Sequence, residues 1–348
     1  MASSGSDPMT ESFCGAREIL LRQGNRYFRE QAPPKQVQLR IIGSAAVAVL
    51  DFDRVRRHAV VKRAVFDGDI FTPEQLLDVH ERIRSRSPSL AAHMPRFLGY
   101  DRDTRYLILE YIEGETLLSI LRKSLWVPGS QAQADTLLRE TARFLAEVCK
   151  VPASEVGLTL TAPRSNQNFL PNFQKRWNNP RIQPFIPRRF RSPNKYLEHF
   201  PESFFQRPID SIAPLDTQPK NYLIQPPGKP FLIDLDYTCH SPAMTLAYFL
   251  VSLDRIGLKF PWAISSSAIT AWKRSVVTAY LEAADPHVCE ELLFYYPLIL
   301  LLMLELHVEQ RPRWRPLLFW YYGGRLRRFL TSMEGYPAKS AGVTAFSL

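Results

Sequence analysis

The sequence has few cysteines and no long hydrophobic run. Its 348 residues contain only four cysteines, Cys14, Cys149, Cys239 and Cys289. Such widely separated cysteines exclude a disulfide framework and a clustered zinc site, so we expect free, mostly buried thiols and a cytoplasmic location. The most apolar stretch, residues 292–304, contains Pro297 and is shorter than the about 20 residues that span a bilayer. It predicts a buried helix, and no transmembrane segment is expected.

Glycine is also scarce, with 15 residues against 28 prolines. The chain contains no Gly-x-Gly-x-x-Gly motif, the usual glycine-rich loop that covers nucleotide phosphates. The N-terminus has no basic segment followed by an apolar one, so nothing in it predicts export. Ala2 stands where N-myristoylation requires glycine, which excludes that anchor.

Charge and composition describe an ordinary globular protein. Lys and Arg number 44 and Asp and Glu 34, a formal net charge of +10, and 45% of the residues are hydrophobic. The length predicts two compact units. A basic chain can attract phosphate-bearing ligands, nucleic acid or an anionic membrane. No nucleic-acid reader motif is present, so nucleic acid is not an expected partner.

The N-terminal third predicts a small antiparallel sheet with one inserted helix. Helical spacing covers residues 16–31. The sequence Thr72-Pro73-Glu74 is a helix-start signature, with an N-cap, a proline and an acid, and this helix should run to about Arg86. Alternating or apolar runs predict strands at residues 37–42, 45–53, 58–66, 96–100 and 105–112.

The remainder predicts a mainly helical unit. Helical spacing covers residues 117–151 and 243–329. The segment 153–214 is rich in proline and asparagine, and we expect it to be dominated by loops. Short apolar runs at 221–225 and 231–235 flank a proline- and glycine-containing turn and predict a hairpin.

Four residues supply the parts that phosphoryl transfer needs. That reaction uses a cation on the α- and β-phosphates, oxygen ligands for Mg²⁺, and a carboxylate that accepts the proton of the attacking hydroxyl. Lys62 lies in the strand AVVKR, from which a long side chain can reach phosphates. Asp216 and Asn221 lie five residues apart in one loop, and Asp234 follows the apolar run FLI. The order and spacing predict a magnesium and nucleotide site.

This ordered set resembles the aminoglycoside phosphotransferase and choline kinase family of the protein-kinase-like superfamily. In that family a loop of the type His-Gly-Asp-x-x-x-x-Asn precedes Ile-Asp-x-Asp/Glu. The resemblance implies an α+β, bilobal, protein-kinase-like fold. Its divisions here would be a leader and helix at 1–36, a small antiparallel N-lobe at 37–112, a helical C-lobe at 113–335, and a tail at 336–348.

The resemblance also implies residue roles and cofactors. Asp216 would be the catalytic carboxylate, and Asn221 and Asp234 would hold Mg²⁺. LILEYIEGETL resembles the hinge between the lobes, so Glu110 to Ile112 would contact the adenine of ATP. The remaining nucleotide contacts would come from Lys62, Gly43, Ser44 and Glu81. Glu81 would orient Lys62, with Glu74 as the alternative two turns away on the same helix face.

The sequence departs from the family pattern at two places. Pro214-Leu215 replaces the His-Gly before Asp216, and Cys149 stands where the family often has histidine. The missing His-Gly, together with the lack of a glycine-rich loop, keeps open a second hypothesis, a catalytically impaired module of the same fold that binds a nucleotide or a partner. We expect His199 and His240 to be surface or helix-capping histidines.

Each candidate residue also has a purely structural interpretation. Lys62 fits an edge-strand lysine, and Asp216 and Asn221 fit turn residues around Pro219. Asp234 fits a structural ion pair. It is the hardest to dismiss, because an unpaired carboxylate at the end of a buried apolar run costs on the order of several kcal/mol.

The expected acceptor is a hydroxyl of a small molecule, such as a sugar, an amino alcohol, or a lipid- or nucleotide-type compound. The segment 175–195 contains seven Lys or Arg, so it fits either an anionic acceptor site or a solvated basic loop. The segment 311–329 mixes arginines with aromatic residues, which leaves peripheral membrane contact open. Core packing of Trp320, Tyr321 and Tyr322 is the alternative that we expect. The sequence predicts no oligomeric state.

Overall fold

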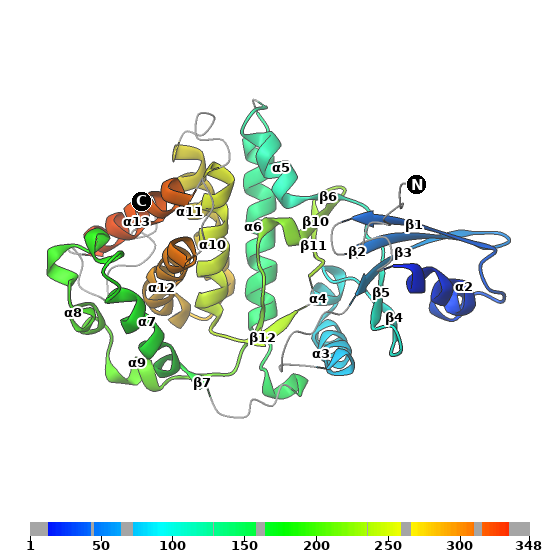
Figure 1. The fold of residues 1–348 in the computed structure, drawn as a ribbon, viewed down its shortest axis with the longest axis horizontal. Coiled ribbons are helices and arrows are strands. Elements are labelled where there is room, and N and C mark those ends of the chain that lie inside the picture. The colour runs from blue at the N-terminus through cyan, green and yellow to red at the C-terminus, as the bar shows by residue number, and fades with distance from the viewer. Residues whose placement is uncertain are drawn as a thin grey trace, which may run out of the picture. The chain divides into compact units, whose positions relative to one another are not determined.

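The structure is a computed structural model. It describes residues 13–42, 45–63, 72–127, 129–157, 164–234, 236–258, 266–309 and 315–333. The chain divides into two compact units (Figure 1). The first comprises residues 1–113 and 231–233, and the second comprises residues 114–230 and 234–348. The candidate residues Asp216, Asn221 and Asp234 therefore all belong to the second unit.

The first unit is built on a five-stranded antiparallel sheet with the strand order β1-β2-β3-β5-β4 (Figure 1). The strands are β1 (Gln36–Ile42), β2 (Ala45–Asp51), β3 (Arg56–Arg63), β4 (Phe97–Asp101) and β5 (Tyr106–Glu110). In β2 the buried residues alternate with half-buried ones, as expected of a sheet with one face in the core. The sequence predicted all five strands, with ends that differ by a few residues where they can be compared; the last residues of the predicted strand 58–66 lie outside the described residues.

One face of this sheet packs against helix α2 (Cys14–Phe28). Ile19 and Leu20 of the helix join Ala46, Ala48 and Val61 of the sheet in one buried cluster. Side chains alternate between the two faces of a strand, so β3 residues next to Val61 in sequence point to the face opposite α2.

Helix α3 (Pro73–Arg86) begins at Thr72, as the sequence predicts. Thr72 Oγ1 accepts a hydrogen bond from the Gln75 backbone N–H at 3.3 Å, and Gln75 Oε1 accepts one from the Thr72 N–H at 2.8 Å. This reciprocal capping box satisfies two N–H groups that a helix start leaves without partners. The short helix α4 (Pro88–Ala92) follows directly.

The second unit is mainly helical. Its helices are α5 (Leu117–Ser124), α6 (Gln131–Cys149), α7 (Leu170–Trp177), α8 (Pro193–Leu197), α9 (Glu202–Gln206), α10 (Pro242–Leu258), α11 (Ser266–Ala283), α12 (His287–Glu309) and α13 (Arg315–Met333). By length and composition α12 could cross a membrane, but 78% of its apolar window is buried inside the protein. That burial is typical of a core helix, which agrees with the sequence prediction.

The proline-rich segment is more ordered than the sequence predicted. Besides α7, α8 and α9, the described part of this segment, residues 153–157 and 164–214, contains four short 3₁₀ helices, at Ser154–Val156, Asn166–Phe169, Gln183–Phe185 and Arg188–Phe190. Phe173, Trp177 and Tyr196 are fully buried, and their rings lie 4.9–6.0 Å apart. Tertiary packing of these rings stabilises helices too short to be stable alone. The prediction of a loop-dominated segment was therefore wrong in part.

Short strands complete the second unit. β6 (Glu115–Thr116), β10 (Tyr222–Gln225) and β11 (Lys229–Leu232) form a three-stranded sheet in the order β11-β10-β6. β9 (Ile212–Pro214) pairs with β12 (Tyr237–Cys239), and β7 (Arg164–Ser165) pairs with β8 (Pro208–Ile209). A hairpin of β10 and β11 was predicted, and the structure ends its second strand two residues before Asp234.

One core prediction was wrong. Tyr322 is fully buried, but Trp320 is 64% exposed, so its ring does not belong to the core. The predicted α+β class, a small antiparallel sheet and a mostly helical remainder, is confirmed.

Candidate functional site

The loop that carries Asp216 is held by a pair of antiparallel strands. Tyr237 of β12 lies opposite Pro214 of β9. One residue further, the Leu215 N–H donates a hydrogen bond to the Asp236 carbonyl oxygen at 2.8 Å. Backbone pairing therefore brings the segment that contains Asp216 beside the segment that contains Asp234 and Asp236, although about 20 residues separate them in sequence.

Asn221 links the two predicted acidic residues directly. Its Nδ2 donates to the Asp216 carbonyl oxygen at 2.9 Å and to Asp234 Oδ2 at 3.3 Å. Asn221 is 8% exposed, so its orientation is fixed by packing as well as by these bonds. The structure thus brings together the three residues that the sequence assigned to catalysis and metal binding.

The carboxylate of Asp216 has a separate contact at each oxygen. Oδ1 accepts a hydrogen bond from the Gln218 N–H at 3.2 Å, and Oδ2 lies 3.2 Å from Lys220 Nζ. The first is the side chain-to-backbone bond typical of an aspartate turn. Lys220 was not among the predicted site residues. Its only signal in the sequence is that it follows Asp216 by four residues.

Buried neighbours anchor this loop. Thr217 is 1% exposed and Tyr222 fully buried, and the Tyr222 ring packs edge-on against Phe249 at 6.0 Å. Burial, the largest cause, raises the pKa of Tyr222 well above its usual value, and the charges of Asp216 and Asp234 act in the same direction. Tyr222 therefore stays neutral and serves as an apolar anchor beside Asn221.

The backbone of Gly114, directly before β6, lies very close to the backbone of β10. Thr116 and Glu115 of β6 pair with Leu223 and Ile224 of β10. A Cβ atom added to Gly114 would lie 2.5 Å from the Ile224 carbonyl oxygen. Only glycine fits this contact without displacing one backbone from the other.

The oxygen donors of this loop fit a magnesium ion. Within the described residues, no group of three or more His, Cys, Asp or Glu could hold a metal by itself. Mg²⁺ is commonly bound through one or two protein oxygen ligands, with water and substrate phosphates completing its octahedron. Asp234 supplies a carboxylate and Asn221 an amide oxygen of this kind, and Asn221 Nδ2 ties the two side chains together by its 3.3 Å hydrogen bond to Asp234 Oδ2.

Lys62 lies in the first unit, on β3. It is opposite Ala45 on one side and Leu107 on the other. Its sequence neighbour Val61 is buried in the cluster under α2, so Lys62 points to the other face of the sheet. The edge-strand interpretation does not fit, because β3 has β2 and β5 as neighbours.

The two candidate partners of Lys62 have other ion-pair contacts. Arg84 Nη1 donates to both carboxylate oxygens of Glu81 at 3.2 Å. Glu74 pairs with Arg102 at 2.9 Å. The orientation of Lys62 by Glu81 or Glu74 stays a prediction.

The other proposed nucleotide contacts lie in the first unit. Glu110 ends β5, and its carboxylate forms two bonds of 3.3 Å with Arg96. Its N–H donates to the Arg96 carbonyl at 2.9 Å. Ile112 is 7% exposed. Gly43 and Ser44 lie outside the described residues.

Burial changes the protonation behaviour of two residues, Cys149 and His240. Burial raises the pKa of the Cys149 thiol to about 11, so the thiol is neutral and cannot replace a histidine in proton transfer. His240, predicted to be a surface or helix-capping histidine, is half-buried and lies two residues before α10. Burial first, and then Arg164, lower its pKa to about 4, and its ring lies 6.2 Å from that of Phe169.

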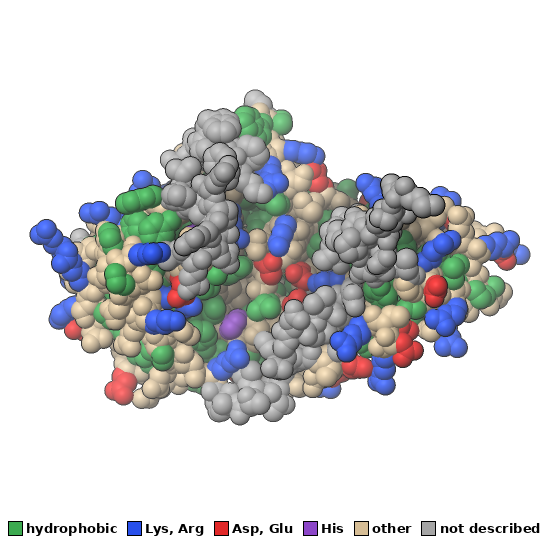
Figure 2. All heavy atoms as spheres, viewed as in Figure 1, with side chains coloured by type: hydrophobic (Ala, Val, Ile, Leu, Met, Phe, Trp, Pro, Cys, Tyr) green, Lys and Arg blue, Asp and Glu red, His purple; other side chains and the backbone are tan. Residues whose placement is uncertain are grey.

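Positive charge does not gather into a single stripe on the face shown in Figure 2. Among the described residues coloured there, Lys and Arg side chains are scattered over both units and mixed with acidic ones. Within the basic segment 175–195, Arg176 pairs with Glu305 at 2.5 Å and Lys195 with Glu198 at 3.1 Å. Part of its charge is therefore neutralised by neighbouring acids.

The fold is similar to that of several solved small-molecule kinases. An ethanolamine kinase from Plasmodium vivax matches with a TM-score of 0.52 and 11% identity over 97% of this chain and 96% of that chain. A microcompartment-associated aminopropanol kinase matches with a TM-score of 0.53 and 16% identity over 86% and 93% of the two chains. The GDP complex of aminoglycoside 2'-phosphotransferase-IIIa matches with a TM-score of 0.50 and 14% identity over 89% and 98%.

No family model and no curated protein matches the sequence. The likeness therefore lies in the fold, at identities of 16% or less for the three structures described. The protein-kinase-like fold that the sequence resemblance implied is confirmed.

Proposed function

We propose that the protein is a phosphotransferase that moves the γ-phosphoryl group of ATP to a hydroxyl of a small molecule. The observation that carries the proposal is the single loop cluster in which Asn221 contacts both Asp216 and Asp234. The fold likeness to small-molecule kinases supports it.

In this function Asp216 is the general base. Its Oδ1 is fixed by the Gln218 N–H and its Oδ2 faces the Lys220 ammonium group, so the carboxylate has one orientation. It accepts the proton of the acceptor hydroxyl as the oxygen attacks phosphorus. Lys220 is then close enough to stabilise negative charge at the reacting group.

Asn221 and Asp234 are the residues that would hold Mg²⁺, and Lys62 would bind the α- and β-phosphates. Magnesium, when bound, neutralises charge on the phosphates during transfer. The chain's own contribution is positioning, since the buried Asn221 amide and the strand-anchored Asp234 are fixed before substrates bind. Glu81, Gly43, Ser44, and the backbone from Glu110 to Ile112 complete the proposed nucleotide contacts.

The acceptor that we propose to test first is a small amino alcohol. Two of the structural neighbours are named for ethanolamine and aminopropanol, and a third is an aminoglycoside phosphotransferase solved with GDP. That GDP complex makes GTP the second phosphoryl donor to test after ATP. The ion pairs of segment 175–195 reduce the case for an anionic acceptor.

The test is phosphoryl transfer from radiolabelled ATP or GTP to ethanolamine, choline, aminopropanol, an amino sugar and a neutral sugar. We expect Mg²⁺-dependent product with at least one acceptor, and loss of product in Asp216→Asn. The matched control is Asp135→Asn, which changes a half-buried aspartate of α6 that pairs with Arg139 at 2.9 Å. Equal activity of Asp216→Asn and Asp135→Asn would show that Asp216 is not the base.

The second candidate is a module of the same fold that binds nucleotide without turnover. Leu215 stands directly before Asp216 where the family has glycine, and it is 51% exposed. Nucleotide binding without transfer to any acceptor would favour this candidate.

A further inference from the structure

The first unit contains a large arginine-lined groove of about 770 Å³. Its walls come from the end of α2, the first residues of β3, the middle of α3, and the adjoining ends of β4 and β5. Its volume lies within the roughly 300–1,000 Å³ typical of small-molecule sites. Six arginines line it, Arg26, Arg29, Arg56, Arg57, Arg84 and Arg96, against two acids, Glu81 and Glu110.

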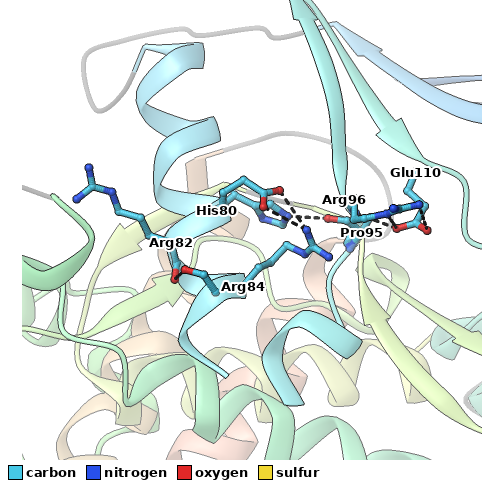
Figure 3. Close-up of polar contacts among 8 residues, drawn as sticks. His80, Arg82, Arg84, Pro95, Arg96 and Glu110 are labelled. Atoms are coloured by element: carbon cyan, nitrogen blue, oxygen red, sulfur yellow. Dashed lines mark hydrogen bonds and ion pairs between the residues drawn. The ribbon is translucent and has the colours of Figure 1, made fainter. Parts of the chain in front are cut away.

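Four of these arginines are held in place by acids. Arg57 donates through Nε and Nη2 to Glu30 Oε1 at 3.1 and 2.9 Å, and Arg56 contacts Asp51 at 2.6 Å. The other two have the contacts already described with groove acids, Arg84 with Glu81 and Arg96 with Glu110. Figure 3 shows Arg84 extending from its helix toward the segment of Pro95 and Arg96, with Arg96 and Glu110 in bidentate contact.

Arg26 and Arg29 differ from the other four. In the described part of the chain, neither side chain forms a hydrogen bond or ion pair. The groove therefore has two unpaired positive charges on one helix end, beside guanidinium groups that are already oriented. Arg84 Nε is also buried without a hydrogen-bond partner among the described residues.

The backbone of Arg29 is a second observation at the same place. Arg29 ends α2 in the left-handed region, with φ 55° and ψ 37°. This conformation costs free energy for a residue with a Cβ atom, and glycine is the usual residue there. Non-glycine residues retained in such conformations are concentrated at ligand sites.

We propose that this groove binds a phosphate group carrying at least two negative charges, with Arg26 and Arg29 as its principal contacts. Guanidinium groups bind phosphate oxygens through paired, charge-assisted hydrogen bonds. The phosphate can belong to a soluble phosphate ester or to a lipid headgroup, which carry the same chemistry.

The groove shares Glu81 and Glu110 with the proposed nucleotide contacts, but its arginines are separate from the phosphate site proposed for Lys62. Both use β3, but the groove takes its first residues, Arg56 to His58, and Lys62 lies four residues beyond His58. At about 3.3 Å per residue, the separation along the strand is about 13 Å. The proposal therefore does not depend on the proposed kinase function.

The chain offers a matched pair of variants. Arg29→Gly removes the charge and relieves the left-handed backbone, so the protein should unfold at the same temperature as wild type or higher. Arg105→Gly removes an exposed arginine that also has a positive φ, of 59°, in the same unit but does not line the groove. The two changes have the same effect on charge and backbone strain and differ in location.

The test is calorimetric titration of the full chain with pyrophosphate at low salt in EDTA, paired with sedimentation on phosphatidylcholine vesicles with and without phosphatidylinositol bisphosphate. We expect binding to wild type, Lys62→Met and Arg105→Gly, weakened about tenfold or more in Arg29→Gly. Binding of pyrophosphate would identify the groove's ligand as a soluble phosphate compound. Binding only to the phosphoinositide vesicles would identify it as a lipid headgroup.

Three results would overturn the proposal. The first is no binding in either arm, and the second is equal binding by Arg29→Gly and Arg105→Gly. The third is loss of binding in Lys62→Met with retention in Arg29→Gly, which would place the phosphate at the nucleotide site.

Discussion

His80 on α3 should make the stability of the protein fall with acid. It is fully buried, and its Nε2 lies 2.7 Å from the Pro95 carbonyl oxygen, to which the neutral ring donates (Figure 3). Burial, the largest cause, lowers its pKa from 6.5 to about 3, and the Arg84 charge acts in the same direction. As pH falls below 6.5, the unfolded chain therefore takes up a proton that the folded chain does not.

Stability from this histidine is complete above pH 6.5 and is lost as pH falls toward 3. Between pH 7 and pH 5, the difference in protonation removes about 2 kcal/mol of the free energy of unfolding. The assay is urea unfolding followed by far-ultraviolet circular dichroism at these two pH values, for wild type and His80→Gln. Glutamine keeps an N–H donor but does not titrate, so wild type should lose about 2 kcal/mol more than the variant.

An equal loss in both proteins would refute this account of His80. A second measurement does not need the variant. The ring resonances of His80 in the folded protein should not shift between pH 7 and pH 5 in an NMR titration. A midpoint near 6.5 would show that the ring is accessible to water.

Three further predictions concern the second unit. Lys273→Met removes the ammonium group 2.5 Å from the carboxylate of the fully buried Asp254, leaving Arg325 at 3.7 Å as its remaining cation, and should cost about 3 kcal/mol in urea unfolding. Gly114→Ala forces the clash with β10 and should lower stability by about 1–3 kcal/mol, while Gly324→Ala, whose Cβ would meet nothing within 4 Å, should not. Lys220→Met breaks an exposed ion pair and should leave stability within about 0.5 kcal/mol of wild type, but slow phosphoryl transfer about tenfold or more in a steady-state assay. Unchanged stability in Lys273→Met or Gly114→Ala, or unchanged turnover in Lys220→Met, would contradict these assignments.

Local signals in the sequence predicted much of the architecture. Thr72 and Pro73 predicted the start of α3 because an N-cap and a proline act through the backbone of their own turn. The apolar runs around Pro226 predicted the hairpin that ends near Asp234. The grouping of Asp216, Asn221 and Asp234 followed from the family resemblance, and in the structure Asn221 bonds the backbone carbonyl of Asp216 and the carboxylate of Asp234.

The remaining features depend on contacts between distant segments. Nothing near His240 in sequence indicates its lowered pKa, to which the charge of Arg164 on β7 contributes after burial. Trp320 belongs to a helix rich in aromatic residues, and spacing alone does not show which ring faces outward. The order of segment 153–214 likewise comes from tertiary packing of its rings, which local proline content does not predict.

Metal-dependent nucleotide binding at the Asp216–Asp234 loop tests the central claim most directly. The measurement is calorimetric titration of ATP into wild type and Asp234→Asn, each with Mg²⁺ and with EDTA. We expect one site in wild type, binding that weakens strongly in EDTA, and no difference between Mg²⁺ and EDTA in Asp234→Asn. The assignment of this loop as the metal site would be contradicted if the affinity of wild type for ATP were the same in Mg²⁺ and in EDTA. It would also be contradicted if EDTA weakened ATP binding equally in wild type and Asp234→Asn.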